Sequence, residues 1–319
     1  MLACALLFGF SHITHGQKRT HRRYNTQQVL KEAKKQYPEY TARLDSLERD
    51  IAALLVSDQD KAIQIPVVFH LMSGDGKTPN AEQVKKQLAI LNAHFGTYTG
   101  KNTGKLPPNA IVAQYAHFGS NLGISFYIPQ KVQDIEGVHI VKTDIKQWSP
   151  DGQLQDPKRG GVAPVDPEHV INIWVGELGK FNAGYAHLPG APLHIDGIVI
   201  DPDYFGTNNG AAQAPYNGGK TLVHLMGSYL GLYELWNNYN PCEDDRVADT
   251  PIHNAPTESI SSEKNARYIT LCNGMVHAMY MNFMDNTDDE LLTLFTPGQK
   301  SRMRAVLALP NGRSGLVKK

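Results

Sequence analysis

The stretch Lys220–Trp236 places the strongest constraint on how this chain can fold. It reads KTLVHLMGSYLGLYELW, with apolar residues at helical spacing up to Gly231. Residues at i and i+4 lie on one face of a helix, so His224 and Ser228 share a face. Glycine can adopt the positive φ that ends a helix sharply, which allows Glu234 to swing back towards that face. The stretch therefore predicts a helix, a tight turn and a returning segment that meet at His224.

This spacing is that of the zinc-binding pattern HExxHxxGxxH, with most of its chemistry replaced. In the full pattern three histidines hold the metal, and the glutamate takes a proton from the bound water. Here His224 stands at the first ligand, Leu225 at the glutamate, Ser228 at the second ligand and Glu234 at the third. Leucine cannot accept a proton, and a serine hydroxyl is a poor zinc ligand beside imidazole. His224 and Glu234 leave two plausible ligands, fewer than a catalytic zinc site needs; taken alone, the stretch also fits a core helix with one histidine.

Ordered sequence blocks along the rest of the chain carry a family resemblance. In chain order they are IPVVFHLM (Ile65–Met72), QLAILNAHF (Gln87–Phe95), INIWV (Ile171–Val175), AGYAHLP (Ala183–Pro189), DGIVID (Asp196–Asp201), VADTP (Val247–Pro251), NFMD (Asn282–Asp285) and FTPGQKSRM (Phe295–Met303). With the helical stretch, they resemble the pappalysin (cytophagalysin-type) family of secreted metzincin zinc metallopeptidases, from about Tyr24 to the last helix. The resemblance implies a metzincin-like α+β fold with Met284 in the Met-turn, packed beneath the position of the zinc ligands.

Other positions depart from the pattern that this resemblance implies. Asn286 stands where the family usually has a tyrosine that steadies the oxyanion, and Tyr24 stands at the cysteine whose thiolate caps the zinc in many pro-segments. Cys242 and Cys272 match one family disulfide, whereas Leu291 replaces a cysteine of the other. The base, two ligands, the oxyanion donor and the zinc cap are therefore altered together. We expect Leu225 and Asn286 to be degenerate catalytic positions, and His224 and Glu234 to be vestigial metal ligands.

The N-terminus has the pattern of an export signal. Leu2–Phe10 is an apolar run of signal-peptide length, too short to span a bilayer, and residues 14–16 fit a cleavage site loosely. We expect residues 1–16 to be a signal peptide that is removed with Cys4; its lack of a basic start indicates a truncated leader. The alternative is a disordered tail. The two remaining cysteines fit a secreted or extracytoplasmic protein with one disulfide.

The chain behind the signal peptide divides into three expected parts. Residues 17–60 form a helical pro-segment, which begins with the solvated basic patch Lys18–Arg23 and continues in a hairpin over Thr26–Leu55, interrupted at Pro38. Residues 61–231 form an N-terminal metzincin subdomain. Residues 232–319 form a C-terminal subdomain with the Met-turn and little regular structure before a helix at Pro297–Leu307.

The alternation of apolar runs predicts the elements of the N-terminal subdomain. Helices are expected at Pro79–His94, with Asn80 as N-cap, and at Lys220–Leu230. Together with the strands they predict a mixed, twisted five-stranded sheet backed by two helices. The expected strands are Ile65–Leu71, Ile124–Ile128, Val138–Val141, Val170–Val175 and Gly197–Ile200.

Three functional interpretations fit the sequence. With 31 Lys and Arg against 31 Asp and Glu, the formal net charge is zero, so we expect neither a nucleic-acid partner nor stable membrane insertion. The favoured interpretation is a secreted pseudoprotease without a cofactor that binds protein or peptide in the old cleft. The second is an active or weakly active zinc metalloendopeptidase whose metal site is rebuilt from other histidines. The third is a structural or surface-interaction protein. The histidines available for rebuilding are His187, His194, His253 and His277.

Overall fold

The computed structural model describes residues 21–54, 61–74, 76–96, 115–207, 210–258, 272 and 278–317. The expected signal peptide, with Cys4 and the first residues of the basic patch, lies outside these ranges, as does His277. Within these ranges, no helix is both long and apolar enough to cross a bilayer.

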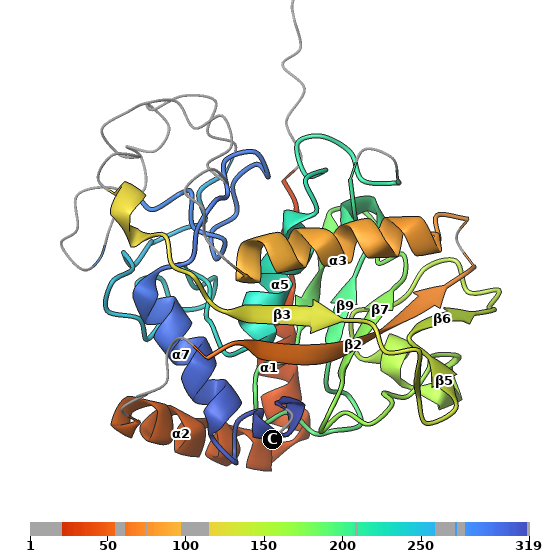
Figure 1. The fold of residues 1–319 in the computed structure, drawn as a ribbon, viewed down its shortest axis with the longest axis horizontal. Helices are drawn as coiled ribbons and strands as arrows, with labels where there is room; N and C mark the ends of the chain where they lie inside the picture. The colour runs from red at the N-terminus through yellow and green to blue at the C-terminus, as the bar shows by residue number, and fades with distance from the viewer. Residues whose placement is uncertain are drawn as a thin grey trace, which may run out of the picture.

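A mostly parallel sheet forms the centre of the molecule (Figure 1). Its strand order is β1-β8-β9-β7-β2-β3, and β6 also pairs with β2. β8 runs antiparallel to β9 and β1 runs parallel to β8, so these two strands oppose the direction of the others. The strands are β1 (Arg23–Tyr24), β2 (Ile63–Met72), β3 (Ile124–Tyr127), β6 (Val138–Val141), β7 (Ile171–Val175), β8 (Asn182–Ala186) and β9 (Ile198–Ile200), and a separate hairpin joins β4 (Lys131–Val132) to β5 (Ile135–Glu136).

The α+β class and the mixed sheet are confirmed, with seven strands in the main sheet instead of five. All five expected strands are present, and β2 pairs with β3 through its first half and with β6 through its second half. The two additional strands are β1 and β8. β8 reads NAGYA, whose asparagine and glycine have low strand propensity, and β1 has two residues, so neither gave a sequence signal.

Two helices pack on the sheet as the sequence predicted. α3 (Ala81–Phe95) begins with a capping box between Asn80 and Gln83, in which each side chain bonds the other's backbone N–H. It packs on β3 and on α5 (Lys220–Tyr229), which in turn packs on β8 and β9. α5 is buried along its length, so it forms part of the core.

The N-terminal helices lie on the same body. α1 (Thr26–Gln36) packs against β8. α2 (Pro38–Ala53) packs against α7 (Pro297–Ala308), as Figure 1 shows. Pro38 is the first residue of α2, where its missing N–H removes no helical hydrogen bond, so the expected interruption separates two helices.

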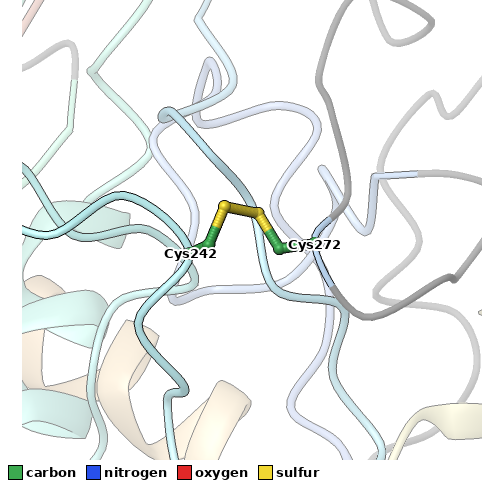
Figure 2. Close-up of a disulfide and its surroundings, with 2 residues drawn as sticks. All are labelled: Cys242 and Cys272. Carbon is green, nitrogen blue, oxygen red and sulfur yellow. A yellow bond between two sulfur atoms is a disulfide. The ribbon is translucent and has the colours of Figure 1, made fainter.

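A disulfide joins two segments that lack regular structure. Cys242 and Cys272 are bonded, with their Cα atoms 5.4 Å apart, as Figure 2 shows. The expected bridge is therefore confirmed. The backbone N–H of Cys272 also donates to the carbonyl of Ile252, which ties the far side of the bridge to the chain that follows α5.

Candidate functional site

His224 lies on α5 with its ring fully buried. Its Nδ1 donates a hydrogen bond to the carbonyl oxygen of Phe283 at 2.8 Å, so in the neutral ring Nε2 carries the lone pair. Burial lowers the pKa of His224, although Glu234 partly opposes this shift. The Nε2 atom lies 3.5 Å from Oε1 of Glu234. The first and third positions of the zinc pattern are therefore brought together.

A glycine turn after α5 brings Glu234 back to His224. Gly231 has a φ of +94°, and a Cβ at this residue would lie 2.7 Å from a side-chain carbon of Val306. The position therefore requires glycine both for its backbone conformation and for its close packing. Glu234 Oε1, His224 Nε2 and the hydroxyl of Ser228 are all buried without a hydrogen-bond partner.

Leu225, at the position of the expected general base, belongs to the hydrophobic core. Its Cδ1 lies 2.9 Å from the point that a Cβ on Gly184 would occupy, so the side chain packs against β8. This position therefore carries an apolar contact between α5 and the sheet and has no group that can accept a proton.

Met284 lies beneath α5. Its Sδ lies 2.7 Å from the point that a Cβ on Gly227 would occupy. Gly227 is three residues after His224 on α5, so the sulfur packs closely against this helix. The carbonyl of Met284 accepts from the backbone N–H of Leu235 at 3.3 Å, and its own N–H donates to Asn282. The turn at residues 282–285 thus contacts both α5 and the segment that returns after Gly231.

Tyr24 covers the ring of His224. The two ring centroids are 3.6 Å apart and the planes are within 2° of parallel. Burial raises the pKa of Tyr24, so the side chain remains a neutral phenol. Tyr24 is the second residue of β1. The residues on either side of it are also held, because the backbone N–H of Arg23 donates to the carbonyl of Phe181 and that of Asn25 to the carbonyl of Gly184. A residue of the N-terminal segment therefore stacks on the first metal-ligand position.

Arg22 corrects the expectation that the basic patch is a solvated linker, because its side chain is 0% exposed. Residues i and i+2 of an extended chain point to one side, so Arg22 and Tyr24 both face inward while Arg23 is exposed. The basic neighbours of Arg22 suggested exposure to solvent, and the available signal for its burial was its position two residues before Tyr24. Its guanidinium donates to Asp289 Oδ1 (2.5 Å), Thr287 O (2.8 Å), Thr221 Oγ1 (3.0 Å) and Asn286 Oδ1 (3.2 Å).

Gln27, on α1, is a second site residue that was not predicted from the sequence. Its Nε2 donates to Oε2 of Glu234 and, at 2.9 Å, to the carbonyl of Trp236. Its Oε1 accepts from the backbone N–H of Asn238 at 2.7 Å. No pattern in the sequence singles out a glutamine on an amphipathic helix. Gln27 nevertheless joins α1 to the segment that carries Glu234.

The other histidines form separate contacts. His253 Nδ1 lies 3.5 Å from Asp285 Oδ2, and burial lowers the pKa of His253 to about 3 while raising that of Asp285 to about 7. His194 bonds the hydroxyl of Tyr37, and His187 is buried. Among the residues that the structure describes, these histidines do not gather with His224 into a set of three or more potential metal ligands.

The chain is similar to known metallopeptidases over most of its length. The model of the Peptidase M43 family, described as pregnancy-associated plasma protein-A, matches residues 165–308. An extracellular metalloprotease of Arthroderma benhamiae is 25% identical over 272 residues, which cover 83% of this chain and 84% of that protein. One of Arthroderma otae is 28% identical over 259 residues, covering 72% and 88%.

Solved structures of mirolysin from Tannerella forsythia share the fold. A promirolysin mutant matches with a TM-score of 0.78 at 27% identity, covering 93% of this chain and 97% of that one. Mature mirolysin in complex with a cleaved peptide matches with a TM-score of 0.70 at 28% identity, covering 81% and 96%.

The donors at this site do not fit a catalytic zinc ion. Two ligands bonded at ~2.1 Å to a tetrahedral zinc lie about 3.4 Å apart, so His224 Nε2 and Glu234 Oε1 could hold two corners. A catalytic site needs a third protein ligand, and the next position offers the hydroxyl of Ser228. Within the described ranges, one set of three acidic or histidine ligand atoms could meet at an ion, and it is made by other residues (Glu177, Asp201 and Asp203).

Proposed function

The chain belongs to the pappalysin (M43) family of metallopeptidases, and from this premise we propose that it is a non-catalytic member whose cleft retains peptide binding. We place the protein outside the cytoplasm, because relatives that it resembles are named extracellular metalloproteases. Its partner in this proposal is a peptide or an extended protein segment, like the cleaved peptide in the mature mirolysin complex.

The main observation in support of lost hydrolysis is that Leu225 is buried in the hydrophobic core. A positioned general base contributes roughly 10²- to 10⁴-fold to the rate, and a leucine packed against β8 supplies none of this. Metal affinity falls as well, because even the loss of a residue that only orients a ligand lowers affinity or activity by about 10- to 100-fold. Ser228 and Glu234 both replace direct ligands.

The observation that supports retained peptide binding is the place of strand β1. An extended segment, Arg23–Tyr24, lies beside β8 and forms backbone hydrogen bonds with the chain around it. Addition of an extended strand to a sheet is a common mode of peptide recognition, because the backbone bonds supply affinity and side-chain pockets supply specificity. The surface beside β8 therefore binds an extended chain in this structure.

A second candidate function is a weakly active zinc peptidase. It is favoured by the 3.5 Å separation of His224 Nε2 and Glu234 Oε1, which suits two ligands of one ion. Elemental analysis of the purified secreted protein separates the two candidates. We expect zinc far below one equivalent and no chelator-sensitive peptide hydrolysis. Zinc near one per chain, with hydrolysis that is lost in His224→Ala, would establish the second candidate instead.

The converse experiment restores the pattern in the full chain. The triple variant Leu225→Glu, Ser228→His and Glu234→His should bind about one zinc, because the backbone retains the turn at Gly231. Adding Asn286→Tyr should raise the rate of any recovered hydrolysis without changing the zinc content. A folded triple variant that takes up no zinc would show that the backbone no longer suits the metal, and would contradict the expectation that substitution alone removed it.

A further inference from the structure

We infer that the cavity between α1 and the segment that follows α5 is a binding site for a small aliphatic primary amine, bound as its ammonium ion. The cavity has a volume of about 410 Å³, which is in the range of small-molecule sites. The inference goes beyond the proposed function, because a soluble amine is a different class of ligand from a peptide. The two share one condition, which is that zinc does not occupy His224 and Glu234.

The inner end of the cavity presents buried acceptors that have no partner in the described part of the chain. Glu234 and Ser228 line the cavity, are 5% and 0% exposed, and leave Oε1 and the hydroxyl oxygen without a hydrogen bond. His224 Nε2 is also unpartnered, because its 3.5 Å distance from Oε1 exceeds that of an ordinary hydrogen bond. Buried polar atoms are nearly always hydrogen-bonded, so these acceptors point to a ligand that donates.

A primary ammonium group has the donors that these acceptors require. It carries three N–H groups and no acceptor, so it can bond Ser228 and Glu234 and share one N–H between Oε1 and the lone pair of His224 Nε2. Its charge strengthens the bond to the carboxylate, whereas water offers two donors and no charge. The second oxygen of Glu234 already accepts from Nε2 of Gln27, which leaves Oε1 for the ligand.

The walls of the cavity suit a short apolar stem behind the ammonium group. α1 and α2 supply one side, and the chain around the end of α5 supplies the other. An aliphatic chain that lies against such walls removes apolar surface from water, which adds affinity without a further polar contact. The apolar lining residues are Leu30, Leu44, Leu188, Leu232 and Trp236.

The charged side chains around the cavity favour a positive ligand. Six acidic and four basic residues line it. Glu48 is paired with Arg302, which lies outside the lining. Lys35 is likewise paired with Glu32, so five acids and three bases remain. The exposed acids near the mouth, such as Glu243, should attract a cation from solvent.

The test measures the Kd of n-butylamine for the full-length protein at neutral pH by tryptophan fluorescence, because Trp236 lines the cavity. The matched neutral and anionic probes are 1-butanol and butyrate. Butylamine should bind about tenfold or more tightly than either, since hydrogen bonds from a charged donor are stronger than neutral ones. Equal binding of butylamine and butanol would show an apolar cavity without an ammonium site and would overturn the inference, as would the absence of butylamine binding.

Glu234→Gln is the main variant, because its amide oxygen can still accept from Gln27 while its NH2 group replaces the acceptor Oε1. It should weaken butylamine binding by about tenfold or more. Ser228→Ala removes the second acceptor in a form that a helix tolerates, and it keeps the test valid should Glu234→Gln fail to fold. It should weaken binding by about threefold to tenfold.

The matched control is Glu39→Gln, which removes an exposed carboxylate of α2 outside the lining and should stay within about twofold of wild type. Unchanged binding in both site variants would overturn the inference. Zinc is measured on the same purified sample. Zinc near one per chain would overturn the proposed function and the ammonium site together, since the ion would take the same acceptors. Zinc-free protein that binds no butylamine would overturn the ammonium site alone, so the two failures are distinguishable.

Discussion

Replacement of Arg22 by methionine should be among the most destabilising single substitutions in the N-terminal segment. The change removes a fully buried cation with its four hydrogen bonds and leaves Asp289 buried with backbone N–H partners alone. Breaking a buried ion pair from one side costs about 3–5 kcal/mol. For a chain of 319 residues the entropy of unfolding at Tm is about 0.7 kcal/mol/K, so Tm should fall by roughly 4–8 °C.

The assay is urea unfolding followed by tryptophan fluorescence, with Arg23→Met as the exposed control, expected within about 0.5 kcal/mol of wild type. Asp289→Asn keeps the acceptor for the two backbone N–H groups and removes the stranded charge. The double variant should therefore lose less than the sum of the singles, with a coupling of about 2 kcal/mol or more. A loss below about 0.5 kcal/mol in Arg22→Met would refute the view that this network holds the segment.

Three further predictions concern other parts of the fold. Under denaturing, non-reducing conditions the secreted protein should show no free thiol at Cys242 or Cys272, and two free thiols would contradict the bridge. Removing this bridge, which closes a 30-residue separation, should lower the free energy of unfolding by about 3–4 kcal/mol. Met284→Ala should cost about 2–5 kcal/mol in urea unfolding, because its buried thioether fills the space beneath α5, and a cost below 1 would show that the site collapses freely. His70 is buried on β2, and burial lowers its pKa from 6.5 to about 4. Between these two pH values the unfolded chain therefore binds a proton at His70 that the folded chain does not. Stability from His70 is therefore lost as pH falls, and the advantage of wild type over His70→Gln should shrink by about 3 kcal/mol between pH 7 and pH 4, whereas parallel curves would contradict the shift.

Much of the framework could be predicted from the sequence because local signals and burial agreed. Asn80 and Pro297 mark helix starts by capping chemistry that acts within one turn, and the spacing from His224 to Glu234 predicted a returning segment. The resemblance to pappalysins supplied the disulfide, which spacing alone leaves open. The division into subdomains, the signal peptide and the roles of the site residues stay predictions.

The parts that the sequence did not reveal depend on partners far along the chain. Arg22 is buried because acceptors gather around it more than 190 positions away, and nothing near Arg22 indicates them. Gln27 has the same difficulty, since its role depends on the turn that returns Glu234. β8 forms because it lies between β1 and β9, although its own residues favour strands weakly.

The short pairing of β1 with β8 has a further consequence for solubility. β8 has β9 on one side and β1 on the other, so without the N-terminal segment it would become the edge of the sheet. An edge strand presents unpaired backbone groups that another chain can extend, which is a common route to aggregation. Natural proteins cover such edges, and here two residues of the chain's own N-terminus provide the cover. A fragment that begins after Asn25 would therefore expose β8 as an edge strand that can pair with other copies of the protein. The recombinant protein is best produced with this segment intact.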